Sequence, residues 1–153
     1  MTESETYIKI TAFCSSAEHC LSEVKERLSR GGVDAQIATT VCDKLVAQRF
    51  VDETRYCRAF IRDKYLFSHW GRYKIGYALS QKQISSSVYT PLLEEIDREE
   101  YLGKLTTLLQ AKAREVKGRT AYERKSNLIR FALGRGFLMD EILHCLPDLE
   151  ENE

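Results

Sequence analysis

The stretch IGYALSQKQISSSVYTPLLEEI, residues 75–96, decides the fold, because the same pattern of apolar residues occurs twice more in the chain. The two other copies are VKERLSRGGVDAQIATTVCDKL, residues 24–45, and LIRFALGRGFLMDEILHCLPDL, residues 128–149. The spacing between the aligned apolar residues is identical in the first two copies. In the third copy, individual intervals differ from this spacing by one residue. The aligned apolar positions are Leu28, Val33, Ile37, Val41 and Leu45, then Leu79, Ile84, Val88, Leu92 and Ile96, then Ala132, Phe137, Ile142, Leu146 and Leu149.

The first copy indicates how each repeat is expected to fold, as two helices joined by a tight turn. Ser15-x-x-Glu18 has the form of a capping box and predicts the start of a helix there. Gly31-Gly32 would end that helix, because glycine tolerates the left-handed conformation that follows a helix. Asp34 would cap the next helix, which is expected to reach about Arg49.

The other two copies carry variations of these signals. In the third, Thr120-x-x-Glu123 is the matching capping box and Asp140 is the expected cap of the final helix. In the second, Lys82-Gln83 stands where the other copies have glycine. Pro91 lies inside the last predicted helix of that repeat and is expected to distort or shorten it, because proline lacks the N–H donor.

A further helix is expected to precede each of the second and third copies. Asp52 would cap a helix over residues 53–67, and another helix would begin at Arg98. The residues expected to face inward are Tyr56, Ala59, Phe60 and Phe67 on the former, and Leu102, Leu105, Leu109, Ala113 and Val116 on the latter. No segment shows the period-two alternation typical of strands. The sequence therefore predicts an all-α fold, an elongated array of three tandem three-helix repeats at 1–51, 52–97 and 98–153, the last with an acidic tail.

The charges are balanced overall but unevenly distributed. The chain has 23 Lys and Arg and 23 Asp and Glu. Eight bases and three acids lie between residues 49 and 82, and eight bases and two acids lie between 112 and 135. From Asp140 onward there are six acids and no base. Such blocks influence the choice of partner even when the total cancels.

Other sequence features narrow the class of protein. No segment has the length of apolar residues that a membrane span needs, and the N-terminus lacks a basic region, so a cytoplasmic protein without a membrane partner is expected. The five cysteines form no CxxC pair and are expected to be small buried hydrophobic residues. The three histidines lie far apart, and no nucleophile or phosphate-loop motif is present. No catalytic, cofactor-binding or metal-binding residue is therefore predicted, and an enzyme is not expected.

The middle repeat carries the residues best suited to contact a partner. Arg55, Arg58 and Arg62 share one side of a predicted helix, and Lys74 and Tyr77 share one side of the next. Cations interleaved with aromatic rings can meet phosphates or carboxylates and stack on bases. An alternative interpretation explains the same spacing: the basic side chains face solvent while the aromatic side chains pack in the core. The candidate contact residues are Arg55, Arg58, Arg62, Trp70, Arg72, Lys74, Tyr77 and Lys82, with Arg124 and Arg130 in a second basic cluster that acidic neighbours could neutralise.

The middle repeat closely resembles the central segment of the RecX regulators. That family's pattern of Asp-acid-x-Arg-Tyr-Ala-Arg-x-Phe-x-Arg, a Gly-Trp-Gly turn, a basic-Ile pair and Leu-x-x-Lys-Gly-Ile is matched from Asp52 to Ile84. RFALGRGFLMDEI, from Arg130, resembles its C-terminal motif, and SSAEHCLSEVKERLSRGGVD its N-terminal motif. The chain departs from the pattern by having Cys57 for Ala, His69 for Gly, Arg72 for Pro and Gln83 for Gly.

The resemblance implies an activity that the residue pattern alone does not. A RecX-type regulator would bind the RecA filament on single-stranded DNA, lie in its groove and restrain ATP turnover, strand exchange and co-protease function. It would act as a monomer and touch single-stranded DNA weakly or through RecA. Two alternatives remain open: a helix-turn-helix module that binds DNA and acts on transcription, and an enzyme. A dependence of affinity on DNA sequence would favour the former, and turnover abolished by a chelator the latter.

Overall fold

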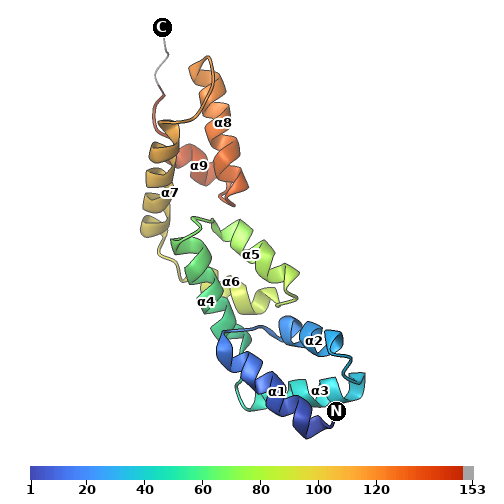
Figure 1. Ribbon diagram of the computed structural model, residues 1–153. Helices are drawn as coiled ribbons and strands as arrows, with labels where there is room; N and C mark the ends of the chain where they lie inside the picture. The colour runs from blue at the N-terminus through green and yellow to red at the C-terminus, as the bar shows by residue number, and fades with distance from the viewer. Residues whose placement is uncertain (150–153) are drawn as a thin grey trace. The chain divides into compact units, whose positions relative to one another are not determined.

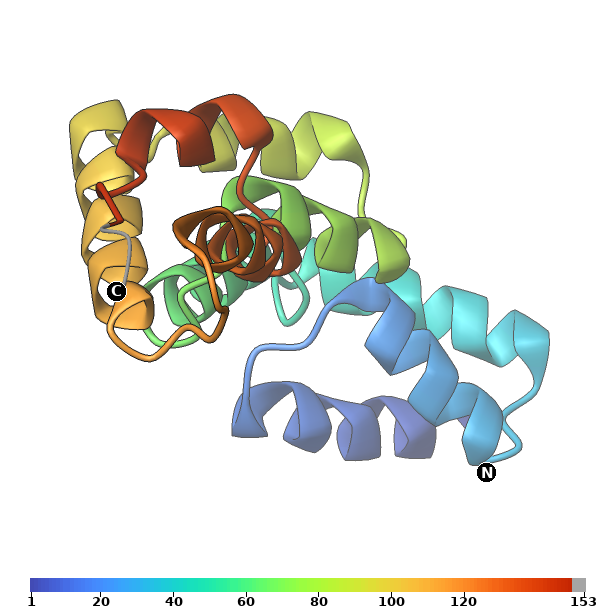
Figure 2. The ribbon, with the colours of Figure 1, turned by 90° about the horizontal axis from the view of Figure 1, so that it is seen from above.

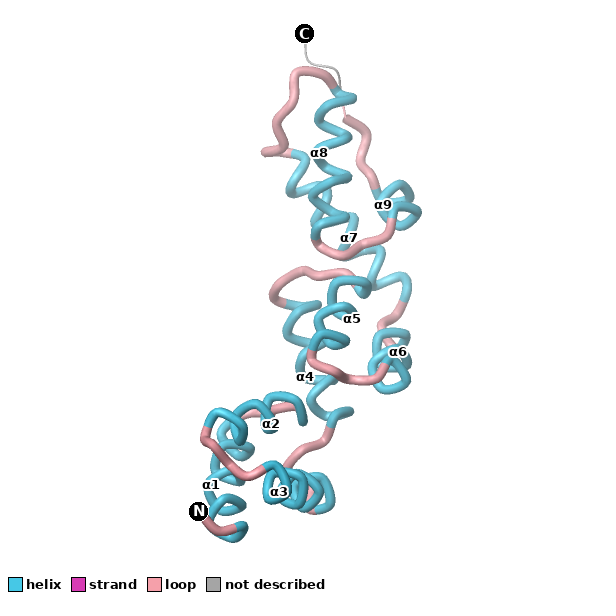
Figure 3. Tube along the Cα trace, turned by 90° about the vertical axis from the view of Figure 1, so that its right-hand side faces the viewer, coloured by secondary structure: helices cyan, strands magenta, loops and turns pink. Residues whose placement is uncertain are grey.

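The computed structural model describes residues 1–149, and these fold into nine helices with no strand (Figures 1 and 3). The remainder of the predicted acidic tail, residues 150–153, lies outside the described residues. Three helices fall within each of the predicted repeat ranges. The helices are α1 (Glu3–Ser16), α2 (Leu21–Arg30), α3 (Ala35–Ala47), α4 (Glu53–Leu66), α5 (Arg72–Gln81), α6 (Ser86–Glu94), α7 (Arg98–Ala113), α8 (Ala121–Gly134) and α9 (Met139–Cys145).

Contacts divide the chain into two compact units. Unit 1 comprises residues 1–60 with 79–89, and unit 2 comprises residues 61–78 with the chain from Thr90 onward. Helices α4, α5 and α6 each contribute residues to both units.

The core of unit 1 lies among α1, α2 and α3. Val24, Val41 and Leu45 are fully buried there, together with Ile10 and Leu28. Each of α2 and α3 therefore buries one face, as the apolar spacing of the first copy predicts. Burying such side chains contributes roughly 1.5–3 kcal/mol each to folding.

The start of α2 differs from the expected capping box. Ser15 lies in the last turn of α1, and α2 begins only at Leu21, so the predicted start at Ser15 is wrong. The Glu23 carboxylate accepts a hydrogen bond from the Cys20 backbone N–H at 3.0 Å and thereby satisfies a donor at the helix end. The other sequence-predicted caps of this unit, Asp34 and Asp52, accept hydrogen bonds from backbone N–H groups of the following helices, as expected.

The spacing that relates the three copies is explained by one turn type. In each copy the backbone N–H at the second anchor donates to the carbonyl of the first anchor, from Val33 to Leu28, from Ile84 to Leu79 and from Phe137 to Ala132. This bond, with a hydrophobic pair at its two ends, is the Schellman motif that closes a helix. The residue before the second anchor is left-handed each time, with φ of 71° at Gly32, 62° at Gln83 and 95° at Gly136.

Of the three left-handed residues Gly32, Gln83 and Gly136, Gln83 is the one with a side chain. Replacing it with glycine is expected to stabilise the protein. Gln83→Gly should raise the free energy of unfolding by about 1 kcal/mol, because the left-handed conformation disfavours residues with a Cβ. The measurement is urea denaturation followed by circular dichroism. The matched control is Gln81→Gly, which places glycine at the last residue of α5 and should lower stability by about 0.5–1 kcal/mol. Equal effects of the two substitutions would contradict this explanation.

The core of unit 2 lies largely among α7, α8 and α9, which pack around one another (Figure 2). Leu105, Leu109, Leu128 and Ile142 are fully buried, and Tyr101 is 1% exposed. Leu105 and Leu109 confirm the predicted inward face of α7, whereas Tyr101 joins the core without having been predicted. In α6 the chain remains helical through Pro91, and the helix is nine residues long where α3 has thirteen.

The final helix is not capped as the sequence predicts. Asp140 lies inside the first turn of α9, and Leu138 occupies the N-cap position, so the expected cap at Asp140 is wrong. Glu141 supplies the missing acceptor, because its carboxylate receives the Leu138 backbone N–H at 2.9 Å. Thr120 caps α8 as expected.

The turn after α8 packs directly against the N-terminus of α5 within unit 2. Backbone N–H groups of Gly71 and Tyr73 donate to the carbonyls of Arg135, at 2.7 Å, and Gly136, at 3.2 Å. Such close approach requires glycine on both sides, since a Cβ on Gly71 would lie 2.5 Å from the Gly136 carbonyl oxygen. Two segments that are far apart in sequence are thereby joined backbone to backbone.

Candidate partner-binding surface

The turn between α4 and α5 holds the single tryptophan between two lysines. The Trp70 backbone N–H donates to the Lys64 carbonyl at 3.0 Å, and His69 takes a left-handed conformation with φ of 57°. The ammonium nitrogens of Lys64 and Lys74 lie 5.0 and 4.6 Å from the centre of the Trp70 ring. Cations at this distance over an aromatic face are attracted by the ring quadrupole. The turn therefore holds two cations in fixed positions, of which Lys64 also lies 3.7 Å from the Asp63 carboxylate.

Large aromatic side chains in the same segment remain exposed. Phe67 is 74% exposed, Tyr73 68% and Tyr77 60%. Tyr73 and Tyr77 are one turn apart and so share a face of α5. Arg62 is exposed on α4. We refer to the exposed residues Arg62, Phe67, His69, Tyr73 and Tyr77, from the segment that contains Trp70, as the 62–77 surface.

Phe67 and Ala59 were both predicted to face inward, and both predictions are wrong because the two residues are exposed. The residues of α4 that are buried in their units are Tyr56, Cys57, Ile61 and Tyr65, at the spacing of one helical face. Phe67 follows Tyr65 by two residues, or about 200° around a helix, and therefore points away from that face.

Arg72 and Lys74 are engaged within unit 2. The Arg72 guanidinium donates to the Leu93 and Ile96 carbonyls at 3.1 and 2.8 Å and lies 4.0 Å from the centre of the Tyr101 ring. Lys74 donates to the Gly134 carbonyl at 3.1 Å in addition to its contact with Trp70. Arg72 thus satisfies carbonyls at the end of the short helix α6 and has a structural role.

The other residues that the sequence predicts to contact a partner fall into two groups, those held by contacts within the protein and those that are exposed. Arg55 and Lys82 are engaged within unit 1, where Arg55 pairs with Glu18 at 2.6 Å and donates to the backbone carbonyls of Arg49 and Phe50. Arg124 is only 8% exposed and donates to the Gly118 carbonyl. The predicted residues with exposed side chains are Arg58, Arg62, Tyr77 and Arg130.

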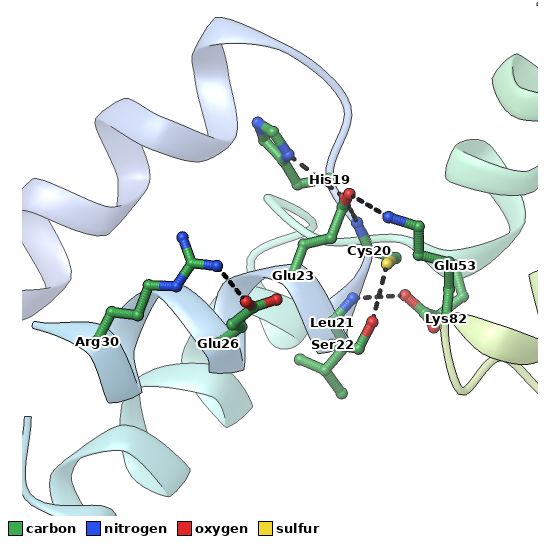
Figure 4. A network of polar contacts seen from close by, with 9 residues as sticks. All are labelled: His19, Cys20, Leu21, Ser22, Glu23, Glu26, Arg30, Glu53 and Lys82. Carbon is green, nitrogen blue, oxygen red and sulfur yellow. Dashed lines mark hydrogen bonds and ion pairs between the residues drawn. The ribbon is translucent and has the colours of Figure 1, made fainter.

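Lys82 belongs to a polar network at the start of α2 in unit 1 (Figure 4). The Lys82 ammonium lies 2.9 Å from one carboxylate oxygen of Glu23, and the His19 ring nitrogen lies 3.4 Å from the other. Glu53 of α4 accepts the Leu21 backbone N–H at 2.8 Å. Lys82 and Glu53, both from the middle repeat, therefore pair with polar groups at the N-terminus of α2 in the first repeat.

The network makes the stability of the protein depend on pH. Burial alone would raise the pKa of Glu23, but hydrogen bonds from Lys82 and from the Cys20 backbone lower it below its ordinary value of 4.5. A carboxylate whose pKa is lowered by folding stabilises the protein above that ordinary value, and the contribution is lost as the pH falls through the folded-state pKa.

Replacing the carboxylate with an amide is expected to remove this contribution. Glu23→Gln should lower the free energy of unfolding at neutral pH by about 1–2 kcal/mol. The difference from the unsubstituted protein should shrink as the pH falls below 4.5, because the protonated carboxyl group is also uncharged. Urea denaturation at a series of pH values measures both effects. A difference that stays constant down to low pH would contradict the role assigned to the Glu23 charge.

Sequence reasoning missed part of the surface. The helical pattern places Phe67 in the core, and the only signal at His69 is its departure from a family pattern. Tyr73 was not singled out, although its spacing of four from Tyr77 on a helix was a usable signal. The arginine spacing alone could not separate Arg62 from Arg55, because the partners of Arg55 come from two loops, one after α1 and one after α3.

Other classes of site find little support in residues 1–149. No group of three His, Cys, Asp or Glu side chains in this range could hold a metal ion. All five cysteines are buried, as predicted, and burial raises the pKa of the Cys57 thiol to about 11. None of the helices in this range has the length and apolar character that crossing a membrane requires.

Known proteins match both the sequence and the fold. The family model described as the second three-helix domain of RecX matches residues 52–89. A regulatory protein RecX of Bacillus cytotoxicus is 24% identical over 149 residues, covering 97% of this chain and 55% of that protein. One from Clostridium botulinum is 30% identical over 122 residues, covering 78% of this chain and 57% of that protein. The chain thus spans little more than half the length of these relatives.

A solved structure extends the comparison to the fold. A crystal structure of a regulatory protein RecX superposes with a TM-score of 0.87 at 17% identity, covering 94% of this chain and 70% of that one. The protein is therefore an all-α helical repeat protein with a cationic, aromatic surface in its middle repeat. The chain belongs to the RecX family.

Proposed function

We propose that the chain regulates a RecA recombinase by binding the RecA filament on single-stranded DNA. Binding would restrain ATP turnover, strand exchange and co-protease activity. The names of its relatives support a regulatory role, and repeat proteins commonly bind partners through such surfaces. The regulator acts by occupying its partner, with no chemistry of its own.

One observation carries this proposal. Within the segment that matches the RecX domain model, several aromatic side chains and an arginine are exposed. Arg and Tyr are enriched among the residues that dominate binding energy at interfaces. Lys64 and Lys74, held against the Trp70 ring, add positive charge that suits a nucleoprotein partner. The 62–77 surface is therefore the proposed contact, with Arg58 and Arg130 as further exposed cations.

The expected result is that Arg62→Ala/Tyr77→Ala weakens filament binding about thirtyfold, from roughly 1 kcal/mol lost at each position. The measurement is the concentration needed for half-maximal inhibition of RecA ATPase on single-stranded DNA, with circular dichroism to verify the helices. The matched control is Ile8→Ala/Arg114→Ala, which removes an exposed large apolar side chain and an exposed arginine outside the 62–77 surface.

Two outcomes would reject the proposal. Unchanged inhibition by the double variant would exclude the 62–77 surface as the contact. Tight binding of the chain alone to a defined DNA sequence, with no effect on RecA, would favour a transcriptional DNA-binding module. Weak, salt-sensitive binding to DNA without sequence preference fits the regulator.

A further inference from the structure

The third repeat exposes apolar side chains at positions where the other two repeats expose polar or small ones. Helices α3, α6 and α9 follow the same turn in their repeats, so their first residues, Ala35, Ser86 and Met139, correspond. The residues just before these three helices correspond in the same way, and so do the fifth residues of the helices. These positions carry Asp34, Ala35 and Thr39 in the first repeat, Ser85, Ser86 and Thr90 in the second, and Leu138, Met139 and Leu143 in the third.

All nine of these side chains are exposed, so burial in the molecule does not explain the difference. Leu138, Met139 and Leu143 are 49%, 46% and 52% exposed. Leu143 also lines a hollow with Tyr122, Leu146 and Pro147. A leucine at the N-cap position forgoes the side-chain hydrogen bond that Asp34 provides in the first repeat. We call Leu138, Met139 and Leu143, with this hollow, the α9 face. A cluster of this kind is typical of an interaction site.

The charges around the α9 face indicate what covers it. Asp140 lies between Met139 and Leu143 and is exposed, and the hollow is lined by one acid, Asp148, and one base, Lys125. Among residues 138–149 there are three acids, Asp140, Glu141 and Asp148, and no Lys or Arg. Acids outnumber bases on this face, so the pairing of two such faces is electrostatically disfavoured. A complementary partner is cationic and offers large apolar side chains.

The 62–77 surface has that chemistry. Residues 61–78 contain four bases and one acid, and they expose Phe67, Tyr73 and Tyr77. We propose that the α9 face of one molecule binds the 62–77 surface of a second copy. Because the two surfaces differ, the contact is heterologous, and each added molecule leaves one free surface of each kind, so that open head-to-tail chains form. The few side chains involved place the contact among small, weak interfaces.

Sedimentation velocity on the chain alone, over a wide range of concentration and at two ionic strengths, tests this proposal. The average mass should rise with concentration and fall with added salt. Leu138→Ser/Met139→Ser/Leu143→Thr installs the residues of the second repeat and should weaken association at least about tenfold. Its urea midpoint should be unchanged or higher, because serine is a better N-cap than leucine. Arg62→Glu/Tyr73→Ser/Tyr77→Ser should weaken association to a similar degree from the other side.

Mixing the two variants distinguishes this contact from others. Each variant retains one intact surface, so the mixture should form dimers and no larger species, whereas each variant alone stays monomeric. The proposal is overturned if the unsubstituted chain is monomeric throughout, or if the α9 variant associates as the unsubstituted chain does. Association that only the α9 substitutions abolish would instead identify pairing of two α9 faces and overturn the assigned occupant. The α9 variant retains the 62–77 surface and should still inhibit RecA, so the failure of either proposal can be recognised separately.

Discussion

Gly136→Ala is expected to lower the free energy of unfolding by about 3–5 kcal/mol, the largest loss from any single methyl group in unit 2. An added Cβ would overlap the Cβ of Lys74 and lie 2.6 Å from the Lys74 backbone nitrogen. The residue also has φ of 95°, which a side chain disfavours. Relief would require the turn to withdraw from α5, which breaks the hydrogen bond from the Tyr73 backbone to the Gly136 carbonyl.

The neighbouring Gly134 provides the control for this prediction. A Cβ there would meet nothing within 4 Å, and the residue ends helix α8. Gly134→Ala should therefore leave stability unchanged or raise it by about 0.5–1 kcal/mol. Urea denaturation followed by the fluorescence of Trp70, the single tryptophan, measures both variants. Similar stabilities of the two variants would show that the close approach of this turn to α5 does not require glycine at position 136.

The second large effect is expected at Arg72. Arg72→Ala should lower the free energy of unfolding by about 3 kcal/mol, because it leaves the Leu93 and Ile96 carbonyls without their charged donor. The stacking of the guanidinium on the Tyr101 ring is lost at the same time. These carbonyls lie at the end of α6, the helix that contains Pro91 and ends at Glu94. The side chain thus stabilises the end of a shortened helix.

Two further variants separate this explanation from a simple loss of charge. Arg72→Lys retains the charge but lacks the planar fork that reaches two carbonyls, so it should recover less than half of the lost stability. Arg130→Ala removes an exposed arginine bonded to Asn127 and should cost less than about 0.5 kcal/mol. Urea denaturation compares the three. Equal losses from Arg72→Ala and Arg130→Ala would exclude the proposed role of Arg72.

The repeat pattern made the fold predictable, because each aligned pair of anchors is a Schellman contact formed within a few residues of chain. Asp34, Asp52 and Thr120 were recognisable as caps for the same reason, since a cap and the N–H group it accepts from are two or three residues apart. Ser15 and Asp140 were predicted as caps but do not occupy the N-cap positions. Instead, the carboxylates of Glu23 and Glu141, which lie within the helices, accept hydrogen bonds from the backbone N–H groups at the helix starts.

The candidate surface was only partly predictable, because a helical position fixes the direction of a side chain but not its neighbour. Arg55 and Arg62 lie on the same predicted side of one helix. Arg55 is held by Glu18 from the loop after α1, whereas Arg62 is exposed. Arg72 and Lys82 were likewise recognised as basic, but their acceptors lie more than 20 residues away in sequence.

The sequence by itself determined the all-α class, the recurring turn and the placement of cationic and aromatic residues in the middle repeat, because these depend on interactions over one or two helical turns. Only the tertiary structure decided which cations stabilise the fold, which aromatic side chains are exposed and why Gly71 and Gly136 must both be glycine. The physical reason is that these properties depend on distances between segments separated by tens of residues, and a local pattern carries no information about such distances.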